Sequence, residues 1–187
     1  MTKTQFKTRF LLSRMNKKRL NHNLALKPAA VLVPFVYRRN ELFVILTQRA
    51  KHLRHHPGQV SFPGGRFEAQ DQTLSQTALR ETQEEIGIKA QQVEIFGTLG
   101  LYRTVSDYKV TPFIGFVDSD YELAIDNNEV AQVFEVPWQF LLQRQSHQCV
   151  TVHRRNKDHK VHFMPYQGQM IWGTTALIIH DLIRHFE

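Results

Sequence analysis

The stretch RETQEEIGI, Arg80 to Ile88, follows a glycine-containing segment, FPGG, at Phe62 to Gly65. Its glutamates, Glu81, Glu84 and Glu85, are spaced three and four residues apart, so a helix here projects the carboxylates from one face. Like charges so close repel unless water solvates them or a multivalent cation neutralises them, and a hard cation such as Mg²⁺ prefers oxygen ligands. The stretch is therefore a solvated helix face or a metal site.

The residues around the glutamates favour the metal site. Gly64 and Gly65 let the backbone approach a ligand closely and expose its carbonyl and amide groups. Arg80 lies four residues before Glu84, so the two can pair along the helix. This pairing would orient one carboxylate and leave the other two glutamates free to bind a cation. The glycines and the helix together predict a site for a cation bound to phosphate.

Length and composition indicate one soluble domain. The chain has 187 residues, enough for one well-packed core and few for two. No apolar run approaches the roughly 20 residues that span a bilayer, so no transmembrane segment is expected. The N-terminal apolar stretch, residues 10–12, is too short for a signal peptide, and Cys149 is the only cysteine. We expect a cytoplasmic protein without disulfides.

The net charge of +7 is concentrated at one end of the chain. Seven of the 24 basic residues, and no acidic residue, lie within residues 1–20, so the remaining 17 basic residues balance the 17 acidic ones. We expect residues 1–24 to form a basic arm, helical and packed through Phe6, Phe10 and Met15 on the domain or a partner subunit. Binding of the arm to a membrane surface or polyanion is the alternative. Because the body is neutral, no nucleic-acid partner is expected.

Periodicity over residues 25–187 predicts one domain of the α+β class. The expected strands cover 30–38 and 42–49 as a hairpin, then 93–104, 109–117 and 129–137, and a second hairpin turns at 156–158. The expected helices cover 75–86, 138–143 and 174–186. Residues 50–65 contain many glycines, prolines and histidines, which predicts a loop without regular structure. Strands outnumber helices, so we expect a mixed sheet covered by helices on both sides.

The glycine pair followed by REXXEEXGI resembles the signature of the Nudix hydrolases, which cleave a nucleoside diphosphate linked to another group. This resemblance implies a Nudix-like α/β/α sandwich with a central mixed sheet. The loop before Arg80 is one residue longer than usual and carries Asp71 where the family has glutamate. That variant, together with LTQRAKHLRHHPGQVSFPGG at Leu46 to Gly65, is similar to the coenzyme A pyrophosphatase branch.

The resemblance implies hydrolysis of coenzyme A or acyl-CoA to 3′,5′-ADP and 4′-phosphopantetheine or its acyl form. Arg49 and Arg54 have the forked donors that phosphate oxygens favour, although either could instead pair with an acid such as Glu68 or Asp71. A transition-metal site formed by His52, His55 and His56 in the same loop is not expected, because the loop lacks a regular spacing that would bring them together. We expect instead that His55 or His56 contacts a phosphate.

We expect Mg²⁺ or Mn²⁺ as the cofactor, because bound cations spread the charge of a diphosphate and activate water. Glu81 and Glu85 are the expected principal ligands, with Glu84 as an auxiliary ligand or water contact. The Gly65 carbonyl is a further candidate ligand. Glu129, in NEVAQVF, is the candidate for a remaining ligand or general base, and its alternative is an ordinary surface glutamate.

Two other functions stay open at this point. The first is hydrolysis of another nucleoside diphosphate derivative, such as ADP-ribose or a dinucleotide. The second is a non-catalytic nucleotide- or polyanion-binding module, against which the intact RE and EE residues argue. A homodimer, and a preference between free and acylated coenzyme A, are not decided by these residues.

Overall fold

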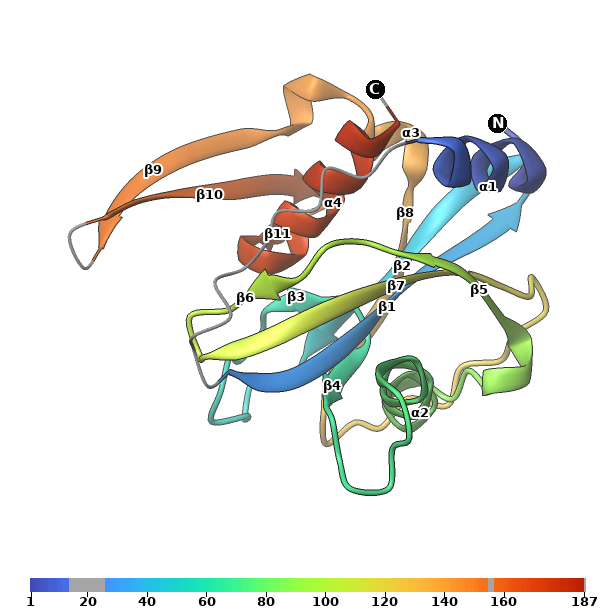
Figure 1. Cartoon of the computed structure of the whole chain (residues 1–187), viewed down its shortest axis with the longest axis horizontal. Coiled ribbons are helices and arrows are strands. Elements are labelled where there is room, and N and C mark those ends of the chain that lie inside the picture. Colours follow the sequence, from blue (N-terminus) through green and yellow to red (C-terminus); the bar gives the residue numbers. More distant parts are fainter. Residues whose placement is uncertain (14–25, 155–156, 187) are drawn as a thin grey trace.

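A mixed β-sheet forms the centre of the molecule, and helices cover both of its faces (Figure 1). This computed structural model describes residues 1–13, 26–154 and 157–186. Helix α2 lies on one face of the sheet, while α1, α3 and α4 lie on the other (Figure 1). The arrangement confirms the predicted mixed sheet with flanking helices.

The elements follow one another along the chain in a strand-rich order. The helices are α1 (Lys3–Leu12), α2 (Leu74–Ile86), α3 (Trp138–Leu141) and α4 (Gly173–His185), with short 3₁₀ turns η1 (Ala90–Gln92) and η2 (Arg144–Ser146). The strands of the large sheet are β1 (Lys27–Arg38), β2 (Glu41–Arg49), β3 (Val60–Ser61), β4 (Gly64–Arg66), β5 (Val93–Thr98), β6 (Tyr102–Arg103), β7 (Tyr108–Val117) and β8 (Val130–Pro137). A smaller sheet contains β9 (Gln148–Arg154), β10 (Lys157–Tyr166) and β11 (Gln169–Trp172).

The pairing of β1 places the glycine segment inside the sheet. Strand β7 runs parallel along one edge of β1, from Lys27 to Val36. On the other edge, β2 pairs with β1 only over residues 35–38, and β4 pairs with it over residues 29–31. The Leu32 amide donates to the Pro63 carbonyl at 2.9 Å between these two stretches. The glycines therefore enter the sheet where β1 and β2 separate.

The prediction of a loop over residues 50–65 was therefore wrong at its C-terminal end. Residues 60–61 and 64–66 form strands, because the extended backbone there finds hydrogen-bonding partners on β2 and β1. The strand predicted over 93–104 divides into β5 and β6, separated by residues 99–101. Strand β11 was not predicted.

Helix α2 begins and ends where its capping residues dictate. Thr73 accepts from the Gln76 amide and the Gln76 side chain accepts from the Thr73 amide, which forms a capping box. At the other end Gly87 has φ 81°, the left-handed conformation that stops a helix at glycine. The predicted helix over 75–86 is confirmed within one residue.

Helix α1 packs on the sheet through two buried phenylalanines. Phe6 is fully buried in an aromatic cluster whose nearest rings are Phe35 at 4.5 Å and Phe186 at 4.6 Å between centroids. The His185 Nε2 atom lies 2.7 Å from the Phe10 carbonyl oxygen, which links α1 to the C-terminal helix. Met15 and the rest of the expected arm to residue 24 lie outside the described residues, and the division into arm and domain stays a prediction.

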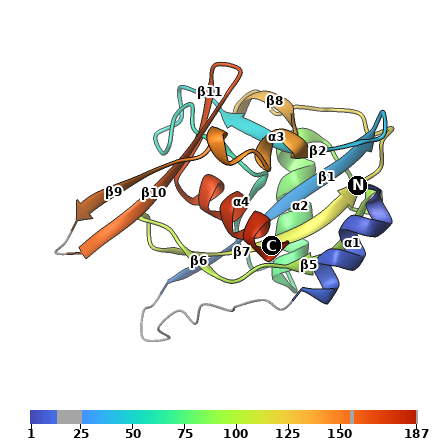
Figure 2. The same ribbon diagram turned by 90° about the horizontal axis from the view of Figure 1, so that it is seen from above.

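The small sheet packs on α4 and extends away from the large one (Figure 2). Strands β9 and β10 pair antiparallel from Arg154 and Lys157 to Gln148 and Phe163, as the predicted hairpin requires. Asn156, the first residue of the predicted turn, lies outside the described residues, but the prediction was wrong for Lys157 and Asp158, which pair with β9 as part of β10. Helix α4 buries Ile178, Ile179 and Leu182. Within the described ranges, no helix is both long and apolar enough to cross a membrane.

Candidate functional site

Two glutamates of α2 contact the glycine strand β4. Glu85 is only 4% exposed, and its Oε2 accepts a hydrogen bond from the Gly64 amide at 3.3 Å. Glu81 lies against Gly65 so closely that a Cβ atom at residue 65 would be 2.4 Å from the Glu81 carboxyl carbon. Only a residue without a side chain fits at position 65 while Glu81 keeps this place.

Two carboxylates of this region, Glu81 and Glu85, have a raised pKa. Burial raises the pKa of Glu85 to about 8, and the negative charges of Glu81 and Glu129 add to the effect. Burial likewise raises the pKa of Glu81, although the Arg80 guanidinium opposes the increase. Glu129 also contributes to the raised pKa of Glu81. The three carboxylates therefore form one electrostatic cluster (the carboxylate cluster: Glu81, Glu85 and Glu129).

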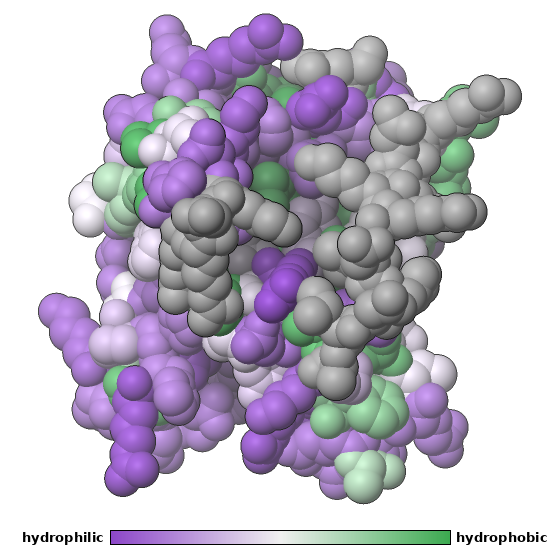
Figure 3. Space-filling view, turned by 60° about the vertical axis from the view of Figure 1, so that its left-hand side comes forward, coloured by the Kyte–Doolittle hydropathy of each residue, from purple (hydrophilic) through white to green (hydrophobic). Residues whose placement is uncertain are grey.

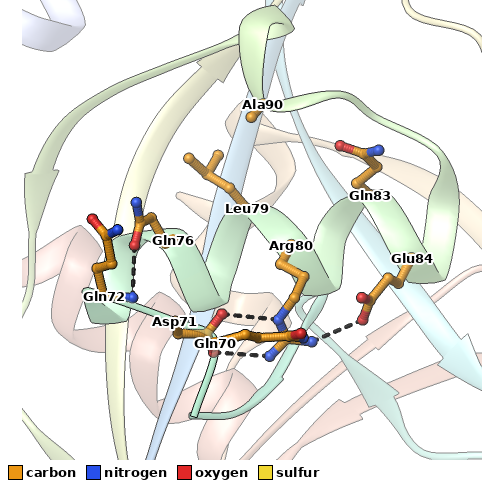
Figure 4. A pocket seen from close by; sticks show the side chains of 9 residues that line it. All are labelled: Gln70, Asp71, Gln72, Gln76, Leu79, Arg80, Gln83, Glu84 and Ala90. Carbon is orange, nitrogen blue, oxygen red and sulfur yellow. Dashed lines mark hydrogen bonds and ion pairs between the residues drawn. The ribbon is translucent and has the colours of Figure 1, made fainter. Parts of the chain in front are cut away.

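Arg80 is held in place by Asp71, which was not among the predicted site residues. Arg80 Nε donates to Asp71 Oδ1 at 2.9 Å, and Arg80 Nη2 donates to Asp71 Oδ2 at 3.0 Å (Figure 4). Asp71 Oδ2 also accepts from the Thr77 hydroxyl at 2.9 Å and from the Glu68 amide at 3.0 Å. The Arg80 guanidinium holds the pKa of Asp71 well below its usual range. The spacing from Gly65 marked Asp71, but only the fold reveals its partners.

The structure corrects the roles predicted for the three glutamates. Arg80 Nη1 does pair with Glu84 at 2.8 Å, but it also lies 3.0 Å from Glu81, so Glu81 is not free. The reason is that Asp71 fixes the guanidinium between both carboxylates. The prediction that all three glutamates share one face is also wrong, because the Glu84 side chain is 57% exposed whereas Glu85 is buried.

A pocket of about 380 Å³ lies on this outer side of α2, beside Arg80 and Glu84 (Figure 4). Most of its lining residues have polar side chains, and the full set comprises Gln70, Asp71, Gln72, Gln76, Leu79, Arg80, Gln83, Glu84 and Ala90. It contains neither Glu81 nor Glu85. The pocket is thus distinct from the carboxylate cluster on the sheet side of the helix.

A short turn brings Glu129 to the C-terminal end of α2. The Asp126 amide donates to the Glu85 carbonyl at 3.1 Å, and the Glu129 amide donates to the Asp126 carbonyl at 3.0 Å. Asp126 Oδ1 also accepts from the Asn128 amide at 2.9 Å, which closes the turn. Glu129 is exposed, and its charge acts on both α2 carboxylates. No feature of the local sequence could have placed it there.

The segment that carries Arg49 and Arg54 is attached to the same turn. The Ala50 amide donates to the Glu129 carbonyl at 2.8 Å, and His52 Nε2 lies 3.0 Å from the Asn128 carbonyl oxygen. Arg49 has a buried Nε without a hydrogen-bond partner within the described residues, and its positive charge lowers the pKa of Glu85. Arg54 is exposed in the loop.

The two acids considered as ion-pair partners of Arg49 and Arg54 pair with other arginines. Asp71 pairs with Arg80, and Glu68 pairs with Arg66 at 3.3 Å. The charge of Arg49 instead acts on Glu85, whose pKa it lowers. His52 contacts a backbone carbonyl, which is a structural contact of the loop.

The donors of the carboxylate cluster suit a hard divalent cation. All are oxygens, and a cation would stabilise the charged carboxylates against the burial and mutual repulsion that raise the pKa of Glu81 and Glu85. As the side chains stand, no three His, Cys, Asp or Glu residues of the described chain converge on one metal position. Glu81 is instead paired with the Arg80 guanidinium. The chemistry fits, and the ligand assignment remains a proposal.

Comparison with known proteins gives a consistent result. The family model described as NUDIX domain matches residues 26–167. A protein of Enterobacter sp. (strain 638), named Uncharacterized Nudix hydrolase NudL, is 40% identical over 184 residues, which are 97% of this chain and 93% of the relative. A protein of the same name from Yersinia pestis (strain Pestoides F) is 42% identical over 154 residues, 82% of this chain and 77% of the relative.

Solved structures show the same fold. The NUDIX domain of Shewanella oneidensis NrtR, complexed with ADP ribose, aligns over 100% of both chains with a TM-score of 0.55 and 18% identity. The crystal structure of DR0079 from Deinococcus radiodurans aligns over 91% of this chain and 98% of that chain, with a TM-score of 0.54 and 14% identity. At these identities the likeness concerns the fold alone.

Proposed function

The chain belongs to the NUDIX domain family and is a Nudix hydrolase, and on that premise we propose that it cleaves the diphosphate of coenzyme A or acyl-CoA. The products are 3′,5′-ADP and 4′-phosphopantetheine or its acylated form. The observation that carries this proposal is the position of the segment Leu46 to Gly65, whose sequence is similar to the coenzyme A pyrophosphatase branch. The segment borders the carboxylate cluster through Arg49, Ala50 and the two glycines.

Two arginines of that segment suit two different phosphates. Arg49 acts electrostatically on Glu85, so its guanidinium is suited to the diphosphate that is cleaved. Arg54 is exposed farther along the loop and is suited to the 3′-phosphate that distinguishes coenzyme A from most other nucleoside diphosphate derivatives. With one arginine at the start of the loop and the other within it, the substrate would use both phosphates.

Nudix hydrolases generally use divalent metals, and here Glu81, Glu85 and the Gly65 carbonyl are the proposed ligands of Mg²⁺ or Mn²⁺, with Glu84 auxiliary. Such an ion supplies charge neutralisation on the phosphoryl oxygens and a water of lowered pKa. The chain itself orients these groups: Asp71 fixes Arg80, and Arg80 in turn fixes Glu81 and Glu84. Glu129 is exposed beside the cluster and is the proposed acceptor of the proton that the attacking water loses.

The test is hydrolysis of coenzyme A by the purified protein with Mg²⁺ or Mn²⁺, followed by detection of 3′,5′-ADP. Dephospho-coenzyme A and ADP-ribose serve as comparison substrates, and a Glu85→Gln variant purified in parallel reports any contaminating hydrolase. We expect coenzyme A to be cleaved with the highest kcat/KM, and an Arg54→Ala variant to lose the preference over dephospho-coenzyme A.

Two results would contradict the proposal. Absence of 3′,5′-ADP at every metal concentration would exclude coenzyme A as a substrate. Equal or better cleavage of ADP-ribose, without dependence on a 3′-phosphate, would instead identify another nucleoside diphosphate derivative as the substrate.

A further inference from the structure

Strand β9 forms an exposed edge of the small sheet. Within the part of the chain that the structure describes, β9 pairs with β10 and with no other strand. Every described side chain of β9 is exposed, including Val150 at 51% and Val152 at 43%. Figure 3, which brings the left-hand side of Figure 1 forward, shows hydrophobic residues at the surface among hydrophilic ones. An edge strand with exposed valines is a template for pairing with another strand.

Lysine, proline and β-bulges, which commonly protect an edge strand, are absent from β9. Natural edges carry lysine, proline or a β-bulge, each of which discourages pairing with a second chain. The sequence QCVTVHR of β9 contains neither lysine nor proline. Its pairing with β10 is continuous from Gln148 to Arg154 with no register shift. The outer edge of β9 is therefore regular and open to a further strand.

Most of this hairpin lacks the support of a third strand. Strand β11 pairs with β10 only over residues 163–166, whereas β9 pairs with β10 over residues 157–163. The two-stranded part projects away from the rest of the molecule, as both ribbon views show (Figures 1 and 2). An isolated two-stranded hairpin is marginally stable in water, and additional strands stabilise it. A third strand at the β9 edge would supply that support.

We propose that two copies of the chain pair through β9, antiparallel, about a two-fold axis at Thr151. This inference does not depend on the proposed substrate. In this register Val150 of each copy lies opposite Val152 of the other copy on one face of the sheet. On the other face, Cys149 lies opposite His153 of the second copy. The result is a four-stranded sheet, β10, β9 and their two equivalents.

The composition of β9 favours a second copy as its partner. Shifting the axis by one residue to Val150 or Val152 would leave one valine of each copy opposite a polar residue, so the hydrophobic pattern selects Thr151. No two like charges lie opposite each other in the selected register, because His153 faces Cys149 and the axis pairs threonine with threonine. The antiparallel direction also points the two hairpin ends away from each other, which separates the basic residues near each turn.

Site-specific cross-linking tests the register. Thr151→Cys and Val152→Cys are each introduced into a chain that also carries Cys149→Ser, so each protein has one thiol. Directly opposed residues of antiparallel strands have Cβ atoms about 4.5–5.5 Å apart, close to disulfide distance. Under mild oxidation the Thr151→Cys protein should form a disulfide-linked dimer. The Val152→Cys protein is the matched control, because its cysteine faces Val150, and it should remain uncross-linked.

The solution mass tests the pairing itself. By light scattering, the full chain should have twice the 21.9 kDa mass of one copy. A variant with Val150→Lys and Val152→Lys places lysines opposite each other and should be monomeric. Val105→Lys, in a loop where the valine is 71% exposed, should remain dimeric. A monomeric wild-type protein, a lysine variant that stays dimeric, or equal cross-linking of both cysteine proteins would overturn the proposal.

Discussion

Asp71 and Glu85 are both buried carboxylates, yet their surroundings push their pKa values in opposite directions. Asp71, before α2, receives two hydrogen bonds from Arg80 and one from Thr77, and its pKa is lowered. Glu85, on the sheet side of α2, receives one opposing hydrogen bond from Gly64, but its burial and then the charges of Glu81 and Glu129 raise its pKa to about 8. Burial alone therefore does not separate a structural carboxylate from a functional one. The partner does.

The two sides of α2 have different roles. On the outer side, Asp71 and Arg80 satisfy each other, and this ion pair fixes the positions of neighbouring side chains. On the sheet side, Glu81 and Glu85 lack a full set of cationic partners, and a buried negative charge of that kind is costly unless a cation accompanies it. This is the physical reason to place the proposed metal ion there.

Replacing Glu85 should have the largest effect on activity and little effect on stability. Glu85→Gln removes a proposed ligand whose cation contributes several kcal/mol to transition-state stabilisation, so kcat should fall about 10²- to 10³-fold. The amide has the size of the protonated acid, which the raised pKa of Glu85 favours at neutral pH. The free energy of unfolding without metal should therefore change by less than about 1 kcal/mol.

Turnover assays and thermal unfolding of the metal-free Glu85→Gln protein measure these two quantities. Titration with Mn²⁺ supplies an independent readout, because loss of a ligand should weaken metal binding. Near-normal turnover would contradict the assignment of Glu85 as a ligand, and unfolding of the variant at room temperature would contradict the expected small effect on stability.

Replacing Asp71 should have a large effect on stability and a smaller effect on activity than replacing Glu85. Asp71→Asn leaves the Arg80 guanidinium without its buried counter-charge and should cost about 3 kcal/mol of the free energy of unfolding. Turnover should fall roughly 10- to 100-fold, because Arg80 then no longer holds Glu81 and Glu84 in position. Denaturant unfolding and steady-state kinetics measure both effects, and a variant as stable as the wild type would contradict the structural role.

The pH dependence of stability provides a control for the role of the ion pair between Asp71 and Arg80. A carboxyl whose pKa is lower in the folded state stabilises the fold at pH values above its unfolded pKa, which is about 3.9 for aspartate. The stabilisation is lost as the pH falls below that value toward the folded pKa. The stability difference between the wild type and Asp71→Asn should thus be constant from neutral pH to about pH 5 and shrink below about pH 4.

The two glycines of β4 differ in the atoms that surround them, so replacing each should have a different effect. Gly64 has φ 149°, and a Cβ atom there would lie 2.4 Å from the Ala30 carbonyl oxygen, so Gly64→Ala should cost about 2–3 kcal/mol in stability. A Cβ atom at Gly65 would instead meet the flexible end of Glu81, so Gly65→Ala should cost under about 1 kcal/mol. Displacement of Glu81 should lower kcat about tenfold. Parallel unfolding and kinetic measurements on the two variants would test this separation, and equal stability losses would contradict it.

The sequence predicts helix α2 well because the signals are local. Gly87, which stops the helix, lies within the motif itself, and the structure confirms the predicted helix over 75–86 within one residue. The mixed sheet likewise follows from the alternation of its strands. Signals of this kind need no knowledge of the tertiary structure.

The contacts that complete the candidate site could not be predicted because they depend on chain segments far apart. Asp71 lies nine residues before Arg80, and the lengthened loop determines whether they meet. The pairing of β4 with β1 and the turn that carries Glu129 arise from tertiary contacts. Similarly, the unequal exposure of Glu84 and Glu85 follows from how α2 rests on the sheet, which helical spacing alone does not specify.

Replacing Glu84 should have the smallest effect of the series. Its side chain is 57% exposed and pairs with Arg80 at a spacing of four residues, a type of pair that contributes about 0.3–0.5 kcal/mol to stability. Because Asp71 holds the guanidinium independently, Glu84→Gln should lower kcat only about two- to fivefold, as expected for an auxiliary group. The measurement is kcat for this variant and for Glu85→Gln at saturating Mn²⁺. If both variants lost activity equally, Glu84 would be a principal ligand despite its exposure, and the distinction between the two sides of α2 would fail.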